Sequence, residues 1–218
     1  MSTETEIERL ITIPDEMRDA HWEHAFLSQL CFAQVRVMQP DPIVGPDSWP
    51  YLHVRLDSKG QEPMSNILLW LSTRGIGLVV DHQENQTYPD YVMPWGTVWW
   101  MVKNKTIPTF AATKPLHENI NVAWKHVAWW GAPSEDFLPA HVRKILREFF
   151  LQQNVLSPKY LLISFDQKVF NLAFSLESLG KPPIEEHQNL LEALSWFFPP
   201  HYPLMLLTEE GSPPFYPL

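Results

Sequence analysis

The sequence predicts an α+β protein with two small antiparallel-sheet domains, each packed with helices. Three observations lead to this prediction. Short apolar strand patterns alternate with amphipathic helix patterns, many of the 21 prolines stand in the connections, and a turn-rich stretch at residues 131–136 separates two parts of different composition. We therefore expect a Trp-rich α+β domain over residues 1–132 and a second α+β domain over residues 133–218.

The first domain is predicted to begin with a helix over residues 14–32. Pro14 and Asp15 open this segment, and acidic residues fill its first turn. The proline-rich residues 39–50 can only form a loop. Strands are then predicted over residues 51–57, 66–72 and 76–81. Since only three residues separate the last two strands, we expect them to form an antiparallel hairpin.

The segment 89-PDYVMPWGTVWWM-101 contains three tryptophans, a tyrosine and two methionines. The apolar run 96-GTVWWMV-102, which overlaps the end of this segment, predicts a strand. Side chains alternate in a strand, so Trp99 and Trp100 would point to opposite faces. A strand that is apolar on both faces is usually covered on both. We therefore expect these two indoles to lie inside the first domain.

The second domain is predicted to have the order α-β-β-α-β. In its first helix, Leu138, Val142 and Leu146 stand at helical spacing, and Asp166 with Gln167 occupies the turn of a hairpin. This order predicts a small antiparallel sheet with helices on one face. The helices are expected over residues 137–154 and 183–198, and the strands over residues 159–165, 168–176 and 203–210.

The C-terminal segments HVRKILREFF, KYLLISF, EEHQNLLEALSWFFP and LMLLTEE, with the terminal PPFY, carry a resemblance to a known family. Residues 137–218 resemble the C-terminal domain of the bacterial enhanced-serine-sensitivity (SseB-like) family. The resemblance implies a cytoplasmic bacterial protein without an assigned enzymatic mechanism, in a family with some members beside secretion systems. It includes no catalytic motif.

The composition argues against several classes of function. The chain carries 16 Lys and Arg against 25 Asp and Glu, a net charge of −9, which disfavours nucleic acids and anionic membranes as partners. A single cysteine, Cys31, excludes a disulfide within the chain and favours a reducing compartment. The N-terminus lacks the pattern of a secretory signal, and no apolar run is long enough for a membrane span. We expect a cytoplasmic protein.

No catalytic residue, cofactor or metal site is predicted. His21 and His24 stand near one helix face, but the sequence supplies no third zinc ligand. His117 and His126 could serve a reaction only if a remote carboxylate joined them in one pocket. Neither a nucleophile elbow nor a phosphate-binding glycine loop is present.

The expected function is therefore non-catalytic binding of another protein, as an adaptor, a secretion-associated protein or an immunity-type protein. The acidic balance favours a basic partner. Alternatives are a small-ligand or carbohydrate binding module, or a hydrolase-type enzyme with a His/carboxylate site. The tail 213-PPFY-216 fits a polyproline-recognition pattern, although it could instead pack onto its own domain. The residues expected to form the interaction surface are Trp124, Trp129, Trp130, Phe215 and Tyr216.

Overall fold

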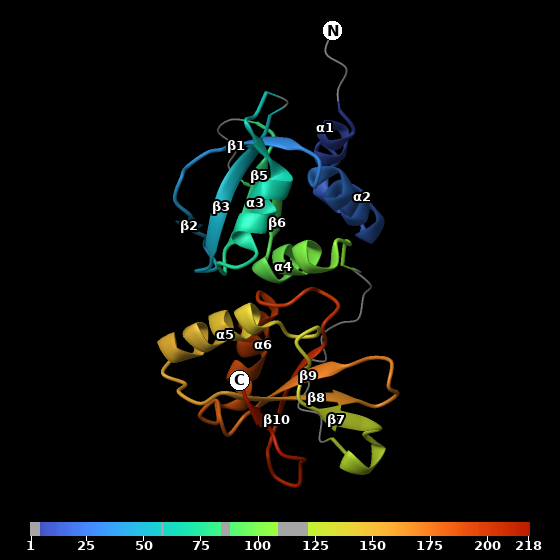
Figure 1. The fold of residues 1–218 in the computed structure, drawn as a ribbon, viewed down its shortest axis with the longest axis vertical. Coiled ribbons are helices and arrows are strands. Elements are labelled where there is room, and N and C mark those ends of the chain that lie inside the picture. The colour runs from blue at the N-terminus through green and yellow to red at the C-terminus, as the bar shows by residue number, and fades with distance from the viewer. Residues whose placement is uncertain (1–4, 58, 84–87, 109–121) are drawn as a thin grey trace. The chain divides into compact units, whose positions relative to one another are not determined.

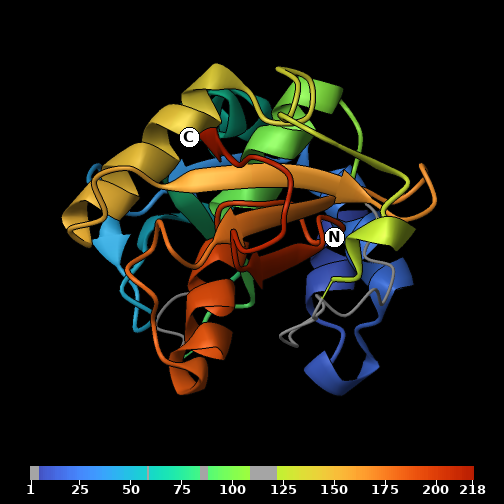
Figure 2. The ribbon, with the colours of Figure 1, turned by 90° about the horizontal axis from the view of Figure 1, so that it is seen from below.

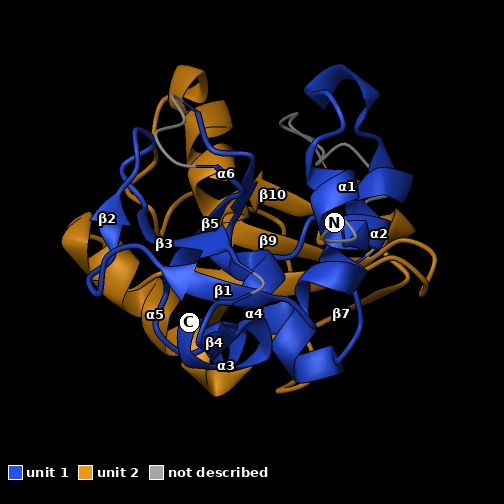
Figure 3. Ribbon diagram, turned by 90° about the horizontal axis from the view of Figure 1, so that it is seen from above, with its two compact units in different colours: residues 1–111, 198–200 blue, residues 112–197, 201–218 orange. Residues whose placement is uncertain are grey.

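A computed structural model describes residues 5–57, 59–83, 88–108 and 122–218. The chain forms two compact units, one of residues 1–111 with 198–200 and the other of residues 112–197 with 201–218 (Figure 3). Each unit has its own sheet, and both sheets are mixed. The predicted α+β class with two sheet regions is confirmed.

The first unit combines four helices with a sheet in the part of the chain that the structure describes (Figure 1). The strand order is β4-β1-β3-β5-β6, and β2 pairs with β3. The β1–β3 and β5–β6 pairs are antiparallel, whereas β3 and β5 are parallel. The elements are α1 (Glu6–Ile11), α2 (Ala20–Leu30), β1 (Gln34–Val37), β2 (Ile43–Val44), β3 (Pro50–Leu56), β4 (Glu62–Pro63), α3 (Met64–Leu71), β5 (Gly77–Asp81), β6 (Tyr91–Met93) and α4 (Trp95–Asn104).

The predicted hairpin of residues 66–72 and 76–81 is wrong, because residues 66–72 belong largely to helix α3. A helix between β3 and β5 is the connection that parallel neighbouring strands need. The burial of α3 follows a helical period: Ile67, Leu68 and Leu71 are buried, whereas Leu69 and Trp70 are exposed. Residues 67–71 are all apolar, so the helical period could not be recognised from the sequence.

The predicted strand over residues 96–102 is also wrong, because these residues lie in helix α4. Trp95 and Trp99, one helical turn apart, are both buried. Trp100 is only half-buried, as expected for the residue about 100° further round the helix. The Trp95 indole N–H donates to the backbone carbonyl of Leu71 at 3.1 Å, which joins α4 to the end of α3.

The two faces of the first sheet differ. Side chains on one face are buried, and Tyr91 on this face packs against Phe26 of α2 at a ring distance of 4.9 Å. The opposite face is polar in large part and more accessible, which is common where only one face of a sheet is covered. The buried side chains include those of Leu52, Val54, Leu78, Val80 and Met93.

In the second unit the helices alternate with strands in the predicted order. The elements are β7 (Trp129–Gly131), α5 (Ala140–Gln152), β8 (Lys159–Ser164), β9 (Asn171–Ser175), α6 (His187–Ser195), β10 (Leu204–Leu207) and β11 (Tyr216–Pro217). Short 3-10 helices at Trp124–His126 and Ile184–Glu186 precede β7 and α6. The predicted order α-β-β-α-β is therefore confirmed by α5, β8, β9, α6 and β10.

The second sheet has the order β10-β9-β8-β11, and β7 also pairs with β8. The prediction that this sheet is antiparallel throughout is wrong. Helix α6 carries the chain back across the sheet, so that β10 runs parallel to β9. The pairing of β7 with β8 also places residues 129–131 in this sheet. The predicted boundary between residues 132 and 133 would separate β7 from it.

Both faces of the second sheet are buried. On one face, Phe174 of β9 packs against Phe150 of α5 at a ring distance of 5.8 Å. The other face carries an apolar cluster of Leu161, Ile163, Ala173, Met205 and Leu207. Non-helical and 3-10 segments pack on this cluster, through the side chains of Val122, Trp124, Val127, Phe215 and Tyr216.

A substitution at Gly96 tests the α4 helix. A Cβ at this position would come within 2.1 Å of backbone atoms of Phe198, which belongs to the same unit. Helix propensity alone would make Gly96→Ala stabilising by about 1 kcal/mol. We expect the opposite sign, a loss of about 1–3 kcal/mol in the free energy of unfolding by urea, because the close packing leaves no space for a methyl group.

The matched control is Asn66→Ala at an exposed helical position of α3. This variant should gain a few tenths of a kcal/mol, because alanine is the better helix former. If Gly96→Ala were as stable as Asn66→Ala, the close approach of α4 to Phe198 would be wrong.

Candidate functional site

The second unit exposes two tryptophans on its edge strand β7. Trp129 is 39% exposed and Trp130 is 44% exposed. β7 has three residues and pairs with the end of β8, Trp129 opposite Ser164 and Trp130 opposite Ile163. Side chains alternate along a strand, so the two indoles lie on opposite faces of the sheet at its edge.

The connection between β8 and β9 adds apolar side chains beside these indoles. Figures 1 and 2 both place β7 at the same end of the sheet as this connection. Phe170 packs edge-on against Trp129 at 5.5 Å, and Phe165 and Val169 are exposed. We call the five side chains of Trp129, Trp130, Phe165, Val169 and Phe170 the tryptophan edge.

A tight turn holds this end of the sheet in shape. The Asp166 carboxylate accepts the backbone N–H groups of Lys168 at 2.8 Å and Val169 at 2.9 Å. These hydrogen bonds lower the pKa of the Asp166 carboxyl below its usual value. Gln167 completes the turn with a left-handed backbone, φ 57°. Apolar residues in this connection are therefore displayed on an ordered backbone.

The other three residues predicted for the interaction surface have a different position. Trp124, Phe215 and Tyr216 are half-buried and pack on the apolar cluster of the sheet. Tyr216 also belongs to β11, which pairs with β8. The tail 213-PPFY-216 thus packs onto its own unit, the second of the two alternatives for this motif. The five predicted residues do not form one surface.

The histidines singled out from the sequence do not form a site within the described residues. His117 lies outside them, and His126 is exposed on a 3-10 helix. His21 and His24 are exposed on α2, and Glu23 between them binds Tyr91, whose hydroxyl donates to its carboxylate at 2.6 Å. Among the described residues, no group of three or more His, Cys, Asp or Glu side chains is placed to hold a metal ion.

The first unit contains two histidine–aspartate pairs that were not predicted from the sequence. His53 Nε2 lies 2.5 Å from an Asp81 oxygen, and His82 Nδ1 lies 2.7 Å from an Asp90 oxygen. The backbone N–H of Asp90 donates to the other Asp81 oxygen at 3.3 Å, which links the pairs. The only feature of the sequence that could have indicated these pairs is the adjacent Asp81 and His82 at the end of a strand. His53 joins them through the parallel pairing of β3 and β5.

These pairs join β3, β5 and the segment that leads into β6. A carboxylate that holds an imidazole can prepare it for proton transfer, but such chemistry also needs a place for a substrate. These four residues line none of the cavities of 720, 300 and 570 Å³ in the described part of the chain. Their evident role is to fix one end of the first sheet.

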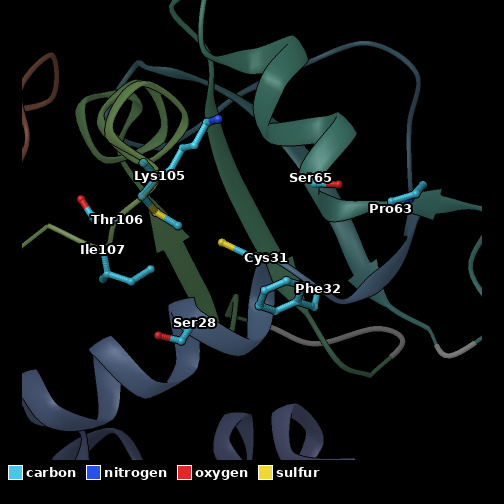
Figure 4. A pocket seen from close by; sticks show the side chains of 9 residues that line it. Ser28, Cys31, Phe32, Pro63, Ser65, Lys105, Thr106 and Ile107 are labelled. Atoms are coloured by element: carbon cyan, nitrogen blue, oxygen red, sulfur yellow. The ribbon is translucent and has the colours of Figure 1, made fainter.

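The cavities differ in size and position. One of 720 Å³ lies in the first unit between the ends of three helices, and a smaller one of 300 Å³ lies beside α1. A third, of 570 Å³, lies between α5 and α6. The largest is lined by Ser28, Cys31, Phe32, Pro63, Ser65, Met101, Lys105, Thr106 and Ile107 (Figure 4).

Cys31, which lines the 720 Å³ cavity, is not an activated nucleophile. Burial raises the pKa of its thiol above the usual value, because the charged thiolate loses solvation. The thiol therefore stays protonated at neutral pH. Cys31 is the C-cap of α2, where it acts as a small, half-buried residue at a helix end.

Comparison with protein-family models, with curated proteins and with solved structures found no match to this chain. The resemblance of residues 137–218 to the enhanced-serine-sensitivity (SseB-like) family therefore stays a prediction. None of the helices in the described part of the chain has the length and apolar character that crossing a membrane requires.

The Glu23–Tyr91 pair makes a prediction about pH. Burial raises the pKa of Glu23 above its usual value, and the hydrogen bond from Tyr91 opposes this effect. A carboxyl with a raised pKa in the folded state destabilises the fold increasingly as the pH rises through its usual value of about 4.3. Glu23→Gln keeps a carbonyl oxygen for Tyr91 without the charge. Its stability relative to the natural chain should therefore be greater at pH 7 than at about pH 4, measured by urea unfolding.

Tyr91→Phe provides the complementary measurement. It removes the hydroxyl and leaves the carboxylate of Glu23 without its partner, so stability should fall more steeply with rising pH than in the natural chain. A relative stability of Glu23→Gln that decreases from about pH 4 to pH 7 would contradict this account.

Proposed function

We propose that this protein works by binding another protein, and that the tryptophan edge of the second unit is the contact surface. The observation that supports the proposal is the pair of indoles on β7, both more than a third exposed, beside the exposed Phe165 and Val169. Tryptophan is enriched among the residues that contribute most to protein–protein binding energy. It offers a large contact area with few rotatable bonds.

The position of these side chains also supports the proposal. β7 is an edge strand of three residues, and its two indoles flank that edge on both sheet faces. A partner that approaches along the edge would contact both rings, whereas a small planar ligand would meet only one of them. The edge therefore favours a protein over a sugar as the partner.

The net charge and the cysteine content suggest the kind of partner and the cellular compartment. The net charge of −9 would draw a basic partner toward the chain and raise the rate of association more than the final affinity. We propose a cytoplasmic location because the chain has one cysteine, whose thiol needs no oxidising environment. An adaptor, a secretion-associated or an immunity-type role would each fit this kind of binding.

The test compares three tryptophan variants. The natural chain is used as bait in a lysate of the source organism, and the dissociation constant of any captured protein is then measured with purified components. Trp129→Ala and Trp130→Ala should each weaken binding by at least about tenfold, because exposed aromatic anchors of an interface contribute more than about 1.4 kcal/mol.

Trp70→Ala is the matched control, because Trp70 is 40% exposed and lies on α3 of the other unit. It should bind the partner within about twofold of the natural chain. The proposal is rejected if the captured proteins are the same with a Trp129→Ala/Trp130→Ala double variant as bait. It is also rejected if Trp70→Ala weakens binding as much as the variants of β7.

A further inference from the structure

The 720 Å³ cavity of the first unit lies where three helices end. Ser28, Cys31 and Phe32 come from the end of α2, and Pro63 and Ser65 from the start of α3. Met101 lies in α4, and Lys105, Thr106 and Ile107 follow it. Figure 4 shows these side chains around a common space, with Cys31 and Phe32 between the residues of α3 and those after α4.

The walls of this cavity are apolar in large part. Phe32, Pro63, Met101 and Ile107 contribute carbon and thioether surface, and Cys31 contributes a neutral thiol. Phe32 is 85% exposed, an unusual position for a phenylalanine at the end of a helix. A volume of 720 Å³ lies within the range of about 300–1,000 Å³ that is typical of small-molecule sites. The cavity therefore suits an apolar molecule.

The polar groups of the lining are few and available. The Ser28 hydroxyl donates to the His24 carbonyl at 2.7 Å, which leaves its oxygen as an acceptor. The side chains of Ser65 and Thr106 make no hydrogen bond with other described residues. Such isolated polar groups in an apolar cavity commonly orient a ligand.

Among the described lining residues only Lys105 is charged, and its ammonium group forms no ion pair with another described residue. Its backbone is left-handed, with φ 53°, where it caps the end of α4. The positive charge of its ammonium group favours an anionic ligand group over a cationic one.

We propose that the cavity binds a carboxylate amphiphile of the fatty-acid class, with its chain against Phe32, Met101 and Ile107 and its carboxylate toward Lys105. This activity is separate from the protein contact proposed above, because all nine lining residues belong to the first unit.

The test titrates the full chain with dodecanoate and with dodecanol, below the concentrations at which they aggregate, in a calorimeter. Dodecanoate should bind with saturation at one molecule per chain.

Ser65→Phe places a ring in the cavity and should weaken binding by at least about tenfold. Asn66→Phe is the matched control, because Asn66 is the exposed next residue of α3 and lines none of this cavity; it should bind within about twofold.

The head group is tested by Lys105→Gln. Loss of a charge-assisted hydrogen bond should weaken dodecanoate binding by about tenfold and leave dodecanol binding unchanged. Lys59→Gln, at an exposed lysine of the same unit outside the cavity, should change neither. Because Cys31 is the only cysteine, saturating dodecanoate should also slow its alkylation by N-ethylmaleimide.

Absence of saturable dodecanoate binding overturns the proposal. Binding to Ser65→Phe as strong as to the natural chain shows that the ligand lies elsewhere, and this also overturns it. An equal effect of Lys105→Gln on dodecanoate and dodecanol overturns the assignment of the carboxylate to Lys105.

Discussion

One parallel pair of strands in each sheet is the constraint on which the rest of this structure depends. β3 pairs in parallel with β5, and β9 with β10. Parallel neighbours cannot be joined by a tight turn, so each pair requires a crossover, provided here by α3 and α6. When the two-residue strands β2 and β4 are left aside, both units share the order α-β-β-α-β, with α2-β1-β3-α3-β5 in the first and α5-β8-β9-α6-β10 in the second. The amino-acid sequence shows no internal repeat that corresponds to this shared order.

The two units differ in how the sheets are covered. The first sheet has one buried face and one polar face, where His53 and Asp81 form their hydrogen bond. In the second sheet both faces are buried, and half-buried side chains near the 3-10 helix and from the tail cover the face away from α5. The side chains of Trp124, Phe215 and Tyr216 pack on this face. The indoles of β7 stay accessible because β7 lies at an edge, where no further described strand covers them.

The two proposed sites have different physical origins. The tryptophan edge exists because a short strand ends a sheet, so its aromatic side chains lack neighbours on one side. The cavity of the first unit lies where the ends of α2, α3 and α4 meet. The first site is proposed to present rigid rings to a large partner, and the second to bind a small amphiphile. Neither involves the histidine–aspartate pairs, which hold the end of the first sheet.

The sequence by itself determined the α+β class and the order of elements in the second unit. Those predictions rested on periodic patterns and turn residues, which are local properties of the chain. Only the tertiary structure decided that residues 66–72 and 96–102 are helices, because a continuous apolar run has no period that separates helix from strand. It also decided the burial of Trp124, the pairing of His53 with Asp81 and the cavity beside Cys31. Each of these depends on residues far apart in the chain, such as His53 and Asp81, which the parallel pairing of β3 and β5 brings together.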